Sequence, residues 1–232
     1  MISSPFVRAF VPAAFALALL GSIPQASAEI AVSNLAERLE NVTAIADLST
    51  GDGDRYGSDS AQAFTVGSIS ATLTSVTLRM EWASAGNGGF RVALWSDAGG
   101  SPGARLAMLT GHPSPIAAGD YTYINQLPPR LPLVAGTTYW VVASVLHTPF
   151  VPAYREFLWA VTDSGAETGA PGWTIANDCQ TIGYTNGVPD AWFSYPGLSQ
   201  QMRIDATLVP EPSALALLLA SAALLSTRRP DH

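Results

Sequence analysis

The sequence has no lysine, one cysteine and few charges. All eleven cations are arginines, charged residues make up 12% of the 232 residues, and the net charge is −7. Average soluble proteins carry about 25% charged residues. An acidic chain with so few cations excludes a basic groove for nucleic acid and an attraction to anionic lipid. With one cysteine there is no intramolecular disulfide, so a hydrophobic core must hold the fold. Cys179 is expected to be a small buried residue, with an exposed thiol or an intermolecular bridge as the alternative.

Recognisable catalytic and metal motifs are also missing. Residues 99–103 (GGSPG) match the G-x-S-x-G pattern of a nucleophile elbow. The residue after the serine must donate its backbone N–H to an oxyanion, however, and Pro102 has none. Residues 52–57 open like an EF-hand loop but lack its later ligands. Asp52, Asp54 and Asp59 therefore remain candidates only for a looser calcium site, against a solvated turn, and no cofactor is predicted.

The first 28 residues have the pattern of a secretory signal peptide. Arg8 supplies a positive charge, residues 9–20 are apolar, and Ala26 and Ala28 form an A-x-A cleavage box before Glu29. This pattern predicts export through the Sec translocon and cleavage by signal peptidase.

The last two dozen residues form a second targeting signal. Residues 213–227 consist of alanine, leucine and small hydroxyl residues, which favour a helix in lipid. Such a helix would be roughly 22 Å long, against a hydrocarbon core of about 30 Å. It is therefore short for a permanent anchor, and we expect only transient insertion into the inner membrane. Arg228 and Arg229 would keep the C-terminus in the cytoplasm.

The segment before this helix carries a sorting motif. Val209 is followed by Pro210, Glu211 and Pro212, and the prolines should hold the glutamate on an extended, accessible hinge. Motif, apolar helix and terminal arginine pair together resemble the PEP-CTERM sorting signal of Gram-negative bacteria. The resemblance implies processing by exosortase and release to the cell surface, in organisms that usually make exopolysaccharide. The chain then divides into residues 1–28, 29–208 and 209–232.

Residues 29–208 are predicted to be all-β, because apolar residues recur with a period of two. Residues 74–82 and 202–208 alternate most clearly, and residues 138–146 form an apolar run typical of a strand buried on both faces. We expect a hairpin from residues 74–82 and 90–94, and a loop at residues 50–60. Residues 29–48 fit either a strand or a short helix. About ten short strands predict an antiparallel β-sandwich or jelly roll. Its predicted core contains Val76, Leu78, Met80, Met202 and Ile204.

Four motifs in this region resemble a second family. They are QAFTVG at 62–67, LWSD at 94–97, GSPG at 100–103 and LVAGTTYW at 133–140. Together they are similar to the choice-of-anchor domains of bacterial surface proteins, type R above all. The resemblance implies a β-sandwich carrying one of several C-terminal anchors, and it implies no activity.

The six tryptophans are the one indication of a ligand. Sugar-binding sandwiches stack aromatic rings on pyranose faces. Trp82 and Trp140 lie in predicted strands, where core packing is expected, whereas Trp95, Trp173 and Trp192 lie beside turns and should be more exposed. Three functions are therefore carried forward. The first is a non-enzymatic surface or matrix protein associated with exopolysaccharide, the second a carbohydrate-binding module, and the third a hydrolase.

Overall fold

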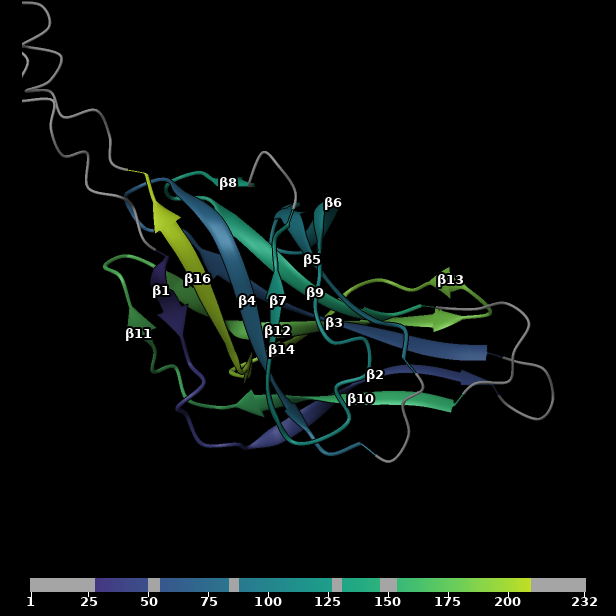
Figure 1. Cartoon of the computed structure of the whole chain (residues 1–232). Coiled ribbons are helices and arrows are strands. Elements are labelled where there is room, and N and C mark those ends of the chain that lie inside the picture. Colours follow the sequence, from purple (N-terminus) through teal and green to yellow (C-terminus); the bar gives the residue numbers. More distant parts are fainter. Residues whose placement is uncertain (1–27, 50–54, 84–87, 127–130, 147–153, 210–232) are drawn as a thin grey trace, which may run out of the picture.

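The computed structural model describes residues 28–49, 55–83, 88–126, 131–146 and 154–209, and within them the chain is all-β. Sixteen strands join into one antiparallel sheet (Figure 1). The strands are β1 (Glu29–Ser33), β2 (Asn41–Ser49), β3 (Arg55–Thr65), β4 (Ala71–Glu81), β5 (Phe90–Asp97), β6 (Pro102–Leu109), β7 (Gly119–Ile124), β8 (Pro132–Leu133), β9 (Thr138–Val145), β10 (Tyr154–Thr162), β11 (Thr168–Gly169), β12 (Thr174–Thr185), β13 (Val188–Pro189), β14 (Phe193–Pro196), β15 (Ser199–Gln200) and β16 (Met202–Leu208).

Hydrogen bonding runs through the sheet in the order β11-β1-β16-β4-β10-β2-β3-β9-β5-β6. β3 is the branch point of this order. β12 pairs with nearly the whole length of β3. The other pairings of β3 are divided between two strands, β2 at residues 55–58 and β9 at residues 60–65. β2 and β9 therefore diverge from a common strand, and apolar side chains fill the space between them.

One large apolar cluster forms the core, and it draws on strands from β1 to β16. The five core residues predicted from the sequence are all fully buried: Val76, Leu78, Met80, Met202 and Ile204. β9, between β3 and β5, is buried on both faces as its sequence predicts. Fully burying a side chain of this size contributes about 1.5–3 kcal/mol relative to its exposure. The period of two therefore identified the residues that hold the sheet together.

Three local predictions are wrong. β4 and β5 form no hairpin, because β4 pairs with β16, β7, β8 and β10, and β5 pairs with β6 and β9. The loop predicted at residues 50–60 is strand from Arg55 onward. Thr74 is off the apolar face, because the β4–β16 register shifts between Asp205 and Ala206 and moves Leu73 into the core instead. The undecided segment 29–48 contains strands β1 and β2.

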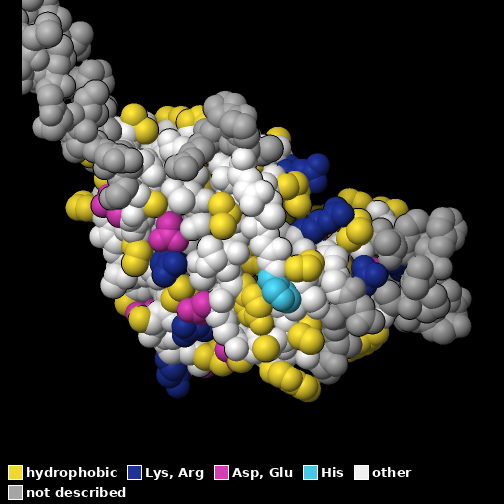
Figure 2. All heavy atoms as spheres, in the orientation of Figure 1, with side chains coloured by type: hydrophobic (Ala, Val, Ile, Leu, Met, Phe, Trp, Pro, Cys, Tyr) yellow, Lys and Arg dark blue, Asp and Glu magenta, His cyan; other side chains and the backbone are white. Residues whose placement is uncertain are grey.

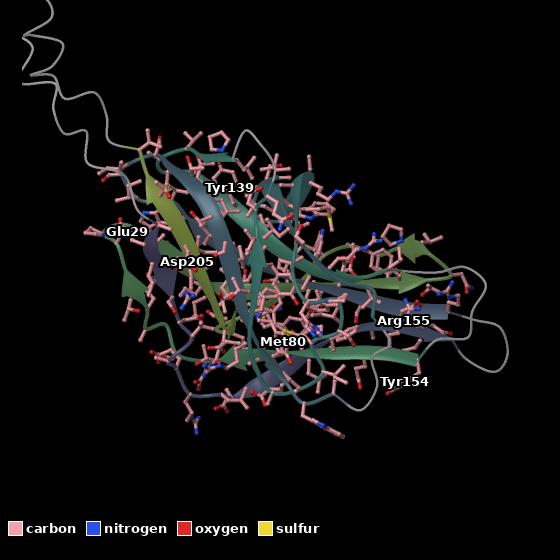
Figure 3. The ribbon with its side chains drawn as sticks, in the orientation of Figure 1. Glu29, Met80, Tyr139, Tyr154, Arg155 and Asp205 are labelled. Carbon is pink, nitrogen blue, oxygen red and sulfur yellow. The ribbon has the colours of Figure 1, made fainter. Side chains whose placement is uncertain are left out.

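Both ends of the described domain lie at one pole. β1 and β16 are antiparallel neighbours in which Glu29 pairs with Ala206, and the Val209 N–H donates to the Ser70 carbonyl at 2.9 Å. Figure 3 shows Glu29 at this end and Tyr154 and Arg155 at the opposite end. We call the end with Glu29 and Val209 the terminal pole. No helix in the described ranges is long and apolar enough to cross a membrane, and both predicted hydrophobic helices lie outside these ranges.

Candidate functional site

The outer face of β3, β9 and β5 carries a second, smaller apolar cluster. It consists of Ala61, Ala63, Trp140 and Val142, with Trp95 and Trp192 packed against it and partly exposed. Strand alternation explains this cluster, because the neighbours of these residues along each strand point into the main core. Two of the three tryptophans proposed for sugar stacking, Trp95 and Trp192, are thus brought to one surface although 97 positions separate them in the sequence.

A hollow of about 310 Å³ lies on this face beside Trp95. We call it the Trp95 hollow and define it by Asp59, Arg91, Ala93, Trp95, Arg105 and Ser144. The spacing follows from β5, where residues 91, 93 and 95 share one face. Register places Ser144 of β9 opposite Arg91, and Arg105 of β6 opposite Trp95. Four adjacent strands, β3, β9, β5 and β6, therefore contribute to its lining.

The two arginines of the hollow differ from the other described arginines in their pairing. Four of the seven form ion pairs, with Glu40, Asp47, Asp120 and Asp205. Arg155 donates to the Leu146 carbonyl. Arg91 and Arg105 are exposed, and neither forms an ion pair within the described ranges. Figure 2 shows dark-blue and magenta side chains side by side over β16, β4 and β7. The hollow thus presents two exposed cations that form no ion pair with a carboxylate of the described residues.

The one carboxylate of the hollow is buried. Asp59 is 7% exposed and its Oδ2 accepts a hydrogen bond from the Tyr184 hydroxyl at 2.8 Å. Burial first, and then the Asp59 charge, raise the pKa of Tyr184 above its ordinary value. Asp59 lies within β3 and was expected in a loop as a calcium candidate. Asp52 and Asp54 lie outside the described residues. Within the described ranges, no three acidic, histidine or cysteine side chains are grouped to hold a metal.

Trp173 corrects the tryptophan prediction. It was expected to be exposed, yet it is 5% exposed and its ring stacks on Phe64 with 6.2 Å between centroids and 7° between planes. Its position before β12 brings it over the main core, so it offers no face to a sugar. The prediction for Trp82 is wrong in the opposite sense. Trp82 was expected to pack in the core, but it is 68% exposed just beyond the end of β4. Trp140 is buried as expected.

Residues 98–101 form the turn between β5 and β6, and Pro102 and Gly103 begin β6, which fits the argument against a nucleophile elbow. The Asp97 carboxylate accepts hydrogen bonds from the Gly99 and Gly100 N–H groups at 3.1 Å and from Trp140 Nε1 at 2.8 Å. Gly99 and Gly100 have φ angles of 71° and 89°, which glycine adopts without strain. The turn is thereby fixed to the strand that carries Trp140, so its residues have a structural role.

Cys179 is fully buried, as predicted. Burial, followed by the nearby Asp178 charge, raises the pKa of its thiol to about 11. A thiol in this state is a poor nucleophile at neutral pH.

Two further hollows lie near β2. One of about 370 Å³ contains Asp47 and Arg55, whose guanidinium contacts both carboxylate oxygens at 2.9 Å. The other, of about 320 Å³, is lined by Thr43, Ser58 and Tyr195 among others. The first is occupied by its own ion pair, and the second has no cation or anion in its lining, so neither matches the unpaired charge of the Trp95 hollow.

The sequence reasoning identified Trp95 but missed Arg91 and Arg105. A signal for Arg91 was available, because it alternates with the core residues of β5 and must share a face with Trp95. No such signal existed for Arg105, whose position depends on two register shifts in the β5–β6 pair.

The predicted processing residues lie at the edges of the described chain. Ala28, Glu29 and Val209 are exposed at the terminal pole, and Ala26, Pro210, Glu211, Pro212, Arg228 and Arg229 lie outside the described residues.

In comparisons with known proteins, no protein-family model matches this chain, and no curated protein matches its sequence.

Proposed function

We propose that this protein is exported, processed at its C-terminus by an exosortase, and held at the cell surface or in the extracellular matrix, where it acts without catalysis. The signal-peptide and sorting patterns of the sequence motivate the proposal. The observation that carries it is the terminal pole. Glu29 follows the predicted cleavage box and Val209 precedes the sorting motif, and the β1–β16 pairing brings them to one end of the molecule.

This arrangement suits a domain that is tethered for a time at the inner membrane. A tail leaving from the terminal pole holds the domain by one end and leaves the other end free. Leu146 lines the Trp95 hollow, and Arg155 donates to its carbonyl at 3.0 Å. Figure 3 shows Arg155 on the side away from Glu29. A tethered molecule would therefore hold the Leu146 end of the hollow away from the membrane.

We further infer that the sheet is folded as a two-layered sandwich of the kind seen in choice-of-anchor domains. The divergence of β2 and β9 from β3 supports this, as does the short β4–β10 junction, where only Leu158 and Trp159 pair across to Glu81 and Met80. A single core between the two arms of the sheet is what this architecture requires.

A carbohydrate-binding module is the second candidate, and the Trp95 hollow favours it. The hollow combines a partly exposed aromatic ring with polar groups from four strands, as binding sites commonly do. Saturable quenching of tryptophan fluorescence by the host's exopolysaccharide, lost in Trp95→Ala, would support it. Hydrolysis of that polymer by the purified protein would contradict the non-catalytic proposal.

Cell fractionation tests the leading proposal directly. The full chain and a variant ending at Val209 should be expressed in an exosortase-containing Gram-negative host, and the domain followed by antibody. The full chain is expected first in the inner membrane and then, shortened, at the surface or in the matrix. The truncated variant should bypass the membrane. Identical distributions of the two chains would contradict the proposal.

A further inference from the structure

We propose that the Trp95 hollow binds anionic glycans, with carboxylates of uronic acid residues held by Arg91 at one end and by Arg105 at the other. The inference deepens the second candidate function and rests on it, because it names the class of sugar that the hollow would select.

The shape of the hollow suits a saccharide chain. Ala93 lies at its floor, with Arg91 two residues before it and Trp95 two residues after it on the same face of β5. Four residues of a strand span about 13 Å. That length exceeds one sugar ring, so the hollow accommodates a short stretch of polymer, with one end over Arg91 and the other over Trp95 and Arg105.

The charge of the hollow selects an anion. Arg91 and Arg105 have no carboxylate partner in the described part of the chain, although the protein carries an excess of acids. Guanidinium groups present a planar fork of donors that matches a carboxylate. Asp59, the carboxylate of the hollow, is buried and accepts a hydrogen bond from Tyr184, and among the described residues it is not ion-paired with either arginine. Figure 2 shows dark-blue side chains over the β5 and β6 end of the view lying among yellow and white ones.

Trp95 supplies the apolar half of the site. Its indole nitrogen is buried and donates to no acceptor in the described residues, so the exposed part of the side chain is carbon surface. Such a surface packs against the C–H face of a pyranose ring, while Arg105, opposite Trp95 in the neighbouring strand, can reach a carboxylate on that ring. Ring stacking and carboxylate binding are therefore adjacent.

A polynucleotide fits the same residues less well. Polynucleotide binding depends on many phosphate contacts, and two arginines on a chain of net charge −7 supply few. At physiological ionic strength, salt screens charges over a distance of about 8 Å. The two arginines would therefore attract only the phosphates that lie at the hollow itself. A uronic acid polymer carries one carboxylate per ring, so two rings of a short stretch supply one carboxylate for each arginine.

Titration of the full chain with polymers of matched backbone tests the inference. Polygalacturonate, its methyl ester, alginate, inorganic phosphate and single-stranded DNA would be compared by isothermal titration calorimetry. Polygalacturonate or alginate is expected to bind saturably, and the methyl ester, which lacks the charge, at least tenfold more weakly. Arg91→Gln and Arg105→Gln should each weaken binding about tenfold. Arg38→Gln removes the same charge from an exposed site elsewhere and should have no effect.

Trp95→Phe and Trp95→Ala separate stacking from charge, and near-UV circular dichroism checks that each variant is folded. Phenylalanine should retain most of the affinity and alanine should lose it. Equal binding of the charged and esterified polymers would overturn the inference and leave the glycan-binding candidate standing. Failure of both uronate polymers to bind, or equally tight binding of phosphate or DNA, would also overturn it. A response to the host's own exopolysaccharide would then decide the second candidate separately.

Discussion

Replacing Trp173 by alanine should strongly destabilise the fold, because burial has made this residue part of the core. It is 5% exposed and stacks on Phe64. A Cβ added at Gly67 would lie 2.8 Å from its Cδ1, so the backbone packs directly against the ring. Tryptophan-to-alanine substitutions in cores cost about 3–5 kcal/mol. Domains are stable by only about 5–15 kcal/mol, so the loss removes a large fraction of the total.

Urea unfolding of the full chain, followed by far-UV circular dichroism, measures this loss. With a slope of about 2 kcal/mol per molar urea, a loss of about 4 kcal/mol lowers the midpoint by about 2 M. Trp82→Ala is the matched control, because Trp82 is 68% exposed and its removal should cost under about 0.5 kcal/mol. Equal effects of the two substitutions, or a loss below about 1 kcal/mol for Trp173→Ala, would refute the assignment of Trp173 to the core.

Three further predictions concern an ion pair, a thiol and a glycine. Asp47→Asn should lower the free energy of unfolding by about 2 kcal/mol in the same assay, because Asp47 is 1% exposed and pairs with the partly exposed Arg55. Glu40→Gln, which breaks an exposed ion pair, should leave the free energy of unfolding nearly unchanged. Cys179 should react with a thiol reagent at pH 8 only after denaturation. Because the pKa of Cys179 is raised to about 11 in the folded state, the protonated thiol should contribute fully to the stability of the fold below pH 9, and this contribution should be lost as the pH rises through 11. Cys179→Ala should reduce this loss of stability at alkaline pH. Gly111→Ala should destabilise by about 1–3 kcal/mol, because the new Cβ would lie 2.3 Å from the Tyr123 ring; an unchanged thermal midpoint would contradict this packing.

The core of the sheet could be predicted because alternation is a local property. Val76, Leu78 and Met80 lie on one face of a strand whatever that strand pairs with. The partner of the strand is not local, however. β4 lies beside β16, more than 120 residues away, and the glycines at residues 86, 88 and 89 therefore suggested a hairpin that does not form. A bulge at Thr74 cannot be read from alternation either, because it depends on the strand opposite.

The candidate site was only partly predictable for a related reason. A tryptophan beside a turn is exposed or buried according to what packs over the turn. Trp95 remains on the outer face of β5, whereas Trp173 follows the turn before β12 into the core. The convergence of Arg91 and Arg105 depends on the pairing of β5 with β6, which composition and spacing do not reveal.

The intact mass of the mature protein from its native host is the most direct test of the proposed function. A chain beginning at Glu29 and ending near the Pro210-Glu211-Pro212 motif is predicted, recovered from the surface or matrix fraction. Such a mass would show that both ends are removed from the terminal pole while the sheet between them is retained. Recovery of the whole 232-residue chain from the cytoplasm would contradict export, sorting and the function proposed from them.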